Sequence, residues 1–70
     1  MIDELKNFRA RVKSIRAQLS LSQENFAHAL GVSFATINRW ENGKTSPSRL
    51  ARKQFDQFCD DMRAQGKIDE

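Results

Sequence analysis

The chain has 70 residues, of which 39% are hydrophobic and 30% charged, with a formal net charge of +3; this is typical of one small domain, too small to enclose a large substrate cavity. Its single cysteine and single histidine exclude an intramolecular disulfide and do not supply the ligands of a structural zinc site. No apolar run approaches the roughly 18 residues of a membrane span, and the first four residues are not typical of a signal peptide, so we expect a cytoplasmic protein with no membrane contact, metal or cofactor.

The first part of the chain has apolar residues at steps of three and four positions. They are Leu5, Phe8, Val12, Ile15 and Leu19. This spacing places them on one stripe of a helix, whose other faces carry charged side chains. The sequence therefore predicts a helix over residues 3–19.

Two short segments then repeat one pattern around Ser22 and Ser33. In each, an apolar residue precedes the serine and another follows it four positions later. A capping hydroxyl between two apolar residues is typical of a helix N-terminus. We expect helices over 23–30 and 34–42, joined by a tight turn at Gly31.

The last predicted helix covers residues 48–65, because Pro47 suits a first helical turn and Gly66 suits a helix end. Its apolar residues cover nearly half of the helix circumference and are Leu50, Ala51, Phe55, Phe58, Cys59 and Met62. Either part of this face contacts a partner subunit or another protein, or the other helices cover all of it. Residues 1–66 are predicted to form one domain, and residues 67–70 a frayed polar tail.

Charge is divided unevenly along the chain. Residues 1–53 contain ten basic and four acidic side chains, whereas residues 54–70 contain two basic and five acidic ones. A basic surface attracts polyanions such as DNA through phosphate neutralisation and counterion release. A solvated basic surface without a ligand explains the charge equally well.

The predicted helix 34–42 has an unusual outward face. At about 100° per residue, Ile37 and Trp40 fall on the inward side, which leaves outside Phe34, Ala35, Asn38, Arg39 and Asn42. A guanidinium, amides and apolar groups match the acceptors, donors and thymine methyl groups of the DNA major groove. The alternatives are that Phe34 folds back onto the core and that Arg39 is an ordinary surface charge.

The segment from Arg16 to Lys44 resembles the lambdoid phage repressor and Cro type of helix-turn-helix, the XRE-like family. The resemblance covers residues 11–48 and includes the Ser22-Gln23 helix start, the inner Ala27, the turn Gly31, the inward Ile37 and the ending Trp40-Glu41-Asn42-Gly43-Lys44. It implies an all-α, lambda-repressor-like DNA-binding domain, a compact bundle of four to five helices. In that fold the helix 23–30 supports the recognition helix 34–42.

The resemblance also assigns roles to residues. It places Phe34, Ala35 and Arg39 at base-contacting positions with Asn38 beside them, and it assigns phosphate contacts to Gln23, Asn42, Lys44 and Thr45. Ser22 joins the phosphate-contacting group because a helix N-terminus offers free N–H groups and a positive dipole end. Arg16 is expected to form a structural pair with Glu41 at the edge of the core.

We therefore expect a sequence-specific, double-stranded DNA-binding transcriptional regulator, in particular a repressor, that binds two half-sites as a homodimer. The alternative is an antitoxin or protein-interaction module that binds a partner protein through its last helix. The sequence has no phosphate-binding glycine loop, carboxylate pair or catalytic triad, and no second ligand or nucleophile is arranged near His28. An enzyme is not expected.

Overall fold

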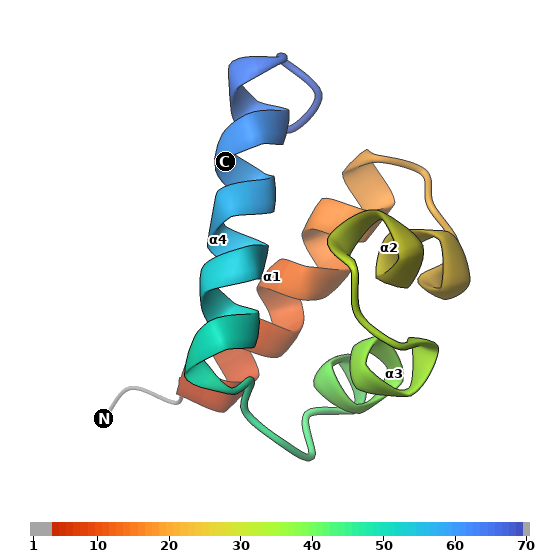
Figure 1. Cartoon of the computed structure of the whole chain (residues 1–70), viewed down its shortest axis with the longest axis vertical. Coiled ribbons are helices and arrows are strands. Elements are labelled where there is room, and N and C mark those ends of the chain that lie inside the picture. Colours follow the sequence, from red (N-terminus) through yellow and green to blue (C-terminus); the bar gives the residue numbers. More distant parts are fainter. Residues whose placement is uncertain (1–3, 70) are drawn as a thin grey trace.

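Four α-helices make up the described part of the chain. The computed structural model describes residues 4–69, with side chains from Lys6 onward, and its helices are α1 (Glu4–Gln18), α2 (Gln23–Leu30), α3 (Phe34–Asn42) and α4 (Arg49–Ala64) (Figure 1). The predicted all-α fold is confirmed, and α2 and α3 begin and end at the expected residues. Within residues 4–69, no helix is both long enough and apolar enough to cross a membrane.

Serine hydroxyl groups cap the beginnings of α2, α3 and α4. The side chains of Ser22, Ser33 and Ser48 each accept a hydrogen bond from the backbone N–H three residues later, at 3.0–3.1 Å. Each cap satisfies a donor that the first helical turn leaves unpaired, and it contributes about 1 kcal/mol. Because Ser48 is the cap of α4, this helix begins at Arg49, and it ends at Ala64, one residue inside each predicted bound.

The core lies between the four helices. Its buried side chains are Phe8, Val12 and Ile15 from α1, Phe26, Ala27 and Leu30 from α2, Ile37 and Trp40 from α3, and Phe55 and Cys59 from α4. Phe8 meets Trp40 and Phe55 edge-on, with 5.2 Å between ring centroids in each pair, a geometry that the ring quadrupoles favour. The apolar stripe predicted for the first helix is therefore the core-facing side of α1. Of its remaining members, Leu19 is partly buried, and the side chain of Leu5 lies outside the described part.

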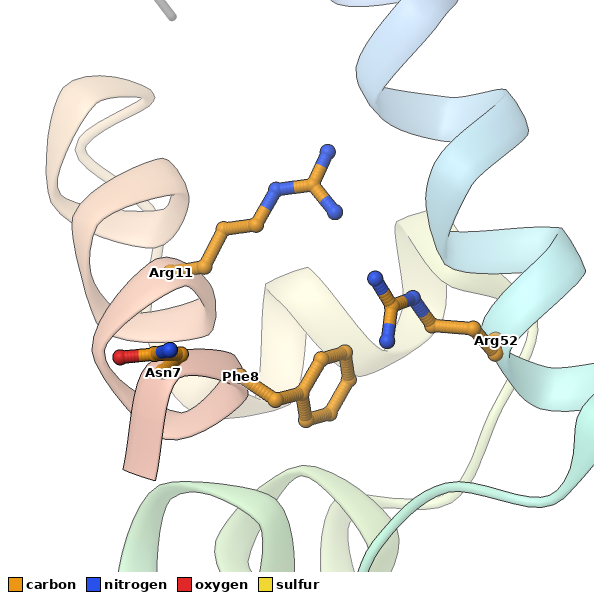
Figure 2. A pocket seen from close by; sticks show the side chains of 4 residues that line it. All are labelled: Asn7, Phe8, Arg11 and Arg52. Carbon is orange, nitrogen blue, oxygen red and sulfur yellow. The ribbon is translucent and has the colours of Figure 1, made fainter. Parts of the chain in front are cut away.

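Ion pairs and cation–π contacts hold α1 against α4. Arg11 and Arg52 both donate to Oδ1 of Asp56, at 3.0 and 3.3 Å. The guanidinium of Arg11 also lies 5.0 Å from the ring centroid of Phe55, and that of Arg52 lies 5.2 Å from the ring of Phe8. Figure 2 shows both side chains extending into the space between the two helices. They line a pocket there of about 270 Å³. Since one carboxylate pairs with both cations, this cluster serves the contact between α1 and α4.

The chain returns to the core after α4. Gly66 has a left-handed φ of 71°, and the backbone N–H of Asp69 donates to Oε1 of Gln18 near the end of α1 at 2.6 Å. Ile68 is only 7% exposed and belongs to the hydrophobic core. The frayed tail predicted over 67–70 is therefore wrong for its described part, because burial of one isoleucine stabilises the return; the last residue lies outside the described part.

Candidate nucleic-acid interface

α2 and α3 form a tight pair joined by three residues. Gly31 ends α2 with a φ of 79°, and its N–H and that of Val32 both donate to the carbonyl of Ala27, at 2.9 and 3.0 Å. The small buried side chain of Ala27 lets the two helices approach closely. Figure 1 shows α3 at the edge of the molecule, packed against α2 and α1, so one side of α3 is left to solvent.

The outward side of α3 carries the predicted base-contacting residues. Ile37 and Trp40 are buried on the inward side, and the structure leaves exposed Phe34, Ala35, Arg39 and Asn42, with Asn38 half-buried. Phe34 is 51% exposed, so it does not fold back onto the core. The structure thus brings these residues together on one helix face.

Three side-chain amides connect this face to the beginning of α2. Nδ2 of Asn42 donates to Oδ1 of Asn38 at 3.0 Å, and Nδ2 of Asn38 donates to Oε1 of Gln23 at 3.3 Å. Sequence reasoning missed both bonds. The i, i+4 spacing of Asn38 and Asn42 is a signal for the first, whereas the second depends on how α2 and α3 pack.

Behind the outward face, Arg16 and Glu41 form the ion pair that the family resemblance implies. Nε and Nη2 of Arg16 donate to the two carboxylate oxygens of Glu41 at 2.6 and 2.8 Å, so the contact is bidentate. Nη1 of Arg16 donates to the backbone carbonyl of Leu21 at 3.1 Å. One guanidinium therefore ties α1 to α3 and to the turn before α2, which fixes the position of α3.

The carboxylate of Glu41 stays ionised although its side chain is only 4% exposed. Burial raises the pKa of Glu41, but hydrogen bonds from Arg16 and Gln23, together with the charges of Arg16 and Lys13, outweigh this effect and lower the pKa below its ordinary value. Glu41 is therefore charged at neutral pH, and Arg16 compensates the charge.

The predicted phosphate-contacting residues lie at two ends of the helix pair. Ser22 and Gln23 are at the start of α2, where first-turn N–H groups have no helical acceptor. Asn42, Lys44 and Thr45 are at the end of α3 and just beyond it, and all three are exposed. Polar and basic groups thus flank the outward face of α3.

Arg9 is a further cation at this surface that sequence reasoning missed. Its Nε donates to the backbone carbonyl of Glu41 at 2.8 Å, and its side chain lies against Gly43, where an added Cβ would be 3.0 Å from Cδ of Arg9. Arg9 is exposed and places a positive charge beside the end of α3. Its spacing from Arg16 could have predicted this position, because the two residues are two helical turns apart on α1 and both face α3.

Comparison with known proteins adds a family and two relatives. A family model described as helix-turn-helix matches residues 12–50. Type II methyltransferase M.SsoII from Shigella sonnei is 40% identical over 57 residues, which cover 77% of this chain and 15% of that protein. Type II methyltransferase M1.ScrFI from Lactococcus lactis subsp. cremoris is 45% identical over 42 residues, which cover 56% of this chain and 11% of that protein. The chain thus spans a small fraction of these relatives, and no solved structure matches it significantly.

The residues of the family match include residues 12–18 of α1, all of α2 and α3, and the first residues of α4. They therefore contain the tight turn, the outward face of α3 and the pair that fixes its position. More than half of the chain matches, and the chain belongs to the helix-turn-helix family of DNA-binding domains, of the XRE, Cro and C1 type that the sequence motif resembles.

Proposed function

We propose that this chain is a sequence-specific, double-stranded DNA-binding transcriptional regulator that places α3 in the major groove. The outward face of α3 carries the proposal. It offers a guanidinium, a phenyl ring and a methyl group to solvent, whereas an exposed helix face normally carries charged and polar side chains. These groups suit base edges and thymine methyl groups.

Each exposed side chain of α3 has a chemically distinct target in this proposal. Arg39 donates two hydrogen bonds to O6 and N7 of a guanine, and Phe34 and Ala35 pack against thymine methyl groups. Asn38 already uses its amide oxygen and one N–H within the protein. It therefore positions its neighbours, and one N–H and one lone pair of its amide remain for a base.

Phosphate contacts fix the orientation of α3 in the groove. Ser22 and Gln23 offer the N-terminus of α2 to one phosphate group, and Asn42, Lys44 and Thr45 contact the backbone at the end of α3. Arg9 joins this second group, because it lies against Gly43 beside them. These contacts supply affinity, and the side chains of α3 supply selectivity.

The regulator is proposed to act as a homodimer and a repressor. One recognition helix covers few base pairs, so two copies are needed on half-sites about 34 Å apart. A protein that occupies a promoter in this way blocks transcription without a catalytic group.

Selection of bound sequences from a random DNA pool tests the proposal. We expect a palindromic site whose half-sites are one helical turn apart, and an affinity at least about 10³-fold above that for random DNA. The affinity should also fall steeply with added salt, because phosphate contacts release counterions. A pool without enrichment, bound with no dependence on salt, would contradict the proposal.

The names of the two relatives favour a second candidate role, which is DNA contact on behalf of a methyltransferase. The outward face of α3 would recognise DNA in the same way in this role. Mapping the selected sequence distinguishes the two candidates. Sites confined to promoters support the regulator, and sites that carry methylated bases throughout the genome support the second role.

A further inference from the structure

α4 leaves an apolar groove open beside α2. The groove has a volume of about 390 Å³, and its lining includes Leu30, Leu50, Lys53, Gln57, Phe58 and Asp61. Leu50 is 71% exposed, although Phe55 and Cys59 on the other side of the same helix are fully buried. The apolar part of this face that solvent reaches therefore consists of the exposed Leu50 and the half-buried Phe58 beside it.

Charged residues are arranged symmetrically along this face of α4. Lys53 lies one helical turn before Gln57, and Asp61 lies one turn after it. Leu50 and Ala64 lie two turns before and after Gln57, and all five side chains are exposed. If a second α4 packs antiparallel about a two-fold axis at Gln57, Lys53 meets Asp61 of the second copy, and Leu50 meets Ala64.

The charged members of this face are Lys53 and Asp61. Among residues 6–69, no ion pair involves Lys53 or Asp61, and Asp61 accepts a side-chain hydrogen bond from Gln57 at 3.2 Å. Pairing with a second copy therefore breaks no ion pair among the described residues.

The order of charges on α4 also opposes the dipole of the helix. Its first turn has no acidic residue and contains Arg49 and Arg52, and Lys53 follows. Asp60 and Asp61 lie near its end, where Arg63 is the basic residue of the last turn. Anions are favoured at a helix N-terminus and cations at a C-terminus, so all of these charges except that of Arg63 are unfavourably placed in an isolated helix. An antiparallel copy of α4 places opposite charges beside each half and compensates for the unfavourable order.

We propose that this face of α4 is the surface through which two copies of the chain associate, with the helices antiparallel about an axis near Gln57. The charge complementarity of the face with itself identifies the occupant, because an isologous interface requires that residue i meets j and j meets i. The inference deepens the homodimer of the proposed function and rests on it for its biological role.

Sedimentation equilibrium of the full chain tests the pairing through charge reversal. Lys53→Glu and Asp61→Lys each place like charges opposite one another at two symmetric positions, so each should weaken the dimer about tenfold. The double variant should restore the native affinity. Glu24→Lys, at an exposed position of α2, changes the net charge by the same amount as Asp61→Lys and should leave the dimer unchanged.

Three outcomes of this experiment overturn the proposal. They are a native chain that stays monomeric, a dimer that neither reversal weakens, and a double variant as weak as the single ones. An assembly with a different protein, formed through this face while the chain alone is monomeric, also overturns it.

Disulfide formation gives an independent test of the geometry. The two-fold axis places residue 57 of one copy beside residue 57 of the other, so mild oxidation of Gln57→Cys should give a covalent dimer. Ala17→Cys, at an exposed position of α1, should not, and equal yields overturn the proposal. Failure here is distinct from failure of DNA recognition, because a monomer that binds one half-site through Arg39 contradicts the homodimer and its α4 interface but supports recognition of DNA by α3.

Discussion

Arg39 and Lys44 are both exposed cations near the end of α3, but only Arg39 belongs to the outward helix face. Arg39→Ala is therefore expected to cost about 1–3 kcal/mol of binding free energy on the selected site and to relax the preference at one base pair, whereas Lys44→Ala should weaken all sequences alike. Titration of selected and random DNA with both variants measures the contrast. Equal losses on the two DNAs for Arg39→Ala would show that this residue contacts only the backbone.

The ionisation of a single residue, Glu41, makes the free energy of unfolding depend on pH. Glu41→Gln takes the bidentate carboxylate from Arg16 and should lower the free energy of unfolding at neutral pH by about 2 kcal/mol. Because folding lowers the pKa of Glu41 from 4.5, the ionised carboxylate stabilises the fold above that value, and this contribution is lost as the pH falls through the lowered pKa. Urea unfolding at several pH values should show the difference between native protein and variant shrinking in acid. A difference that stays constant would assign the loss to packing alone.

At the scale of helices, Gly31 and Gly43 have similar backbone conformations and different neighbours. Their φ values are 79° and 70°. Among the described residues, nothing lies within 4 Å of a Cβ added at Gly31, whereas one added at Gly43 would be 3.0 Å from Cδ of Arg9. Alanine at either position should destabilise the fold by about 1–2 kcal/mol through backbone strain, as thermal unfolding would measure. Only Gly43→Ala should also weaken DNA binding by displacing Arg9, and equal affinities of the two variants would remove Arg9 from the phosphate contacts.

Helix bounds and contacts between helices differ in how far the sequence predicts them. The ends of α2 and α3 could be predicted because their signals are local, a capping serine before each helix and a glycine after it. The outward position of Arg39 followed from helical periodicity. The bond between Asn38 and Gln23 could not be predicted in this way, since it depends on the packing of two helices. The pair of Arg16 and Glu41, 25 residues apart, was accessible only through the family resemblance.

For the molecule as a whole, the return of the chain to the core extends the domain beyond α4. Ile68→Ser removes a buried side chain and should lower the free energy of unfolding by about 2 kcal/mol. Lys67→Ser, at the exposed neighbouring position, is the matched control and should have little effect on urea unfolding. Similar effects of the two variants would contradict a role for Ile68 in the core. The sequence did not predict this contact, because one apolar residue among polar ones has no period.

The buried charge of Glu41 has a consequence for the exterior of the whole molecule. A carboxylate only accepts hydrogen bonds, so Gln23 turns its amino group toward Glu41 and its oxygen toward Asn38. Asn38 must then give its amino group to Gln23 and its oxygen to Asn42. The buried negative charge thereby fixes the orientation of three side-chain amides in turn, and the last two of these belong to the solvent-facing side of α3. A mutation inside the protein can therefore alter what its exterior recognises without changing any exterior residue.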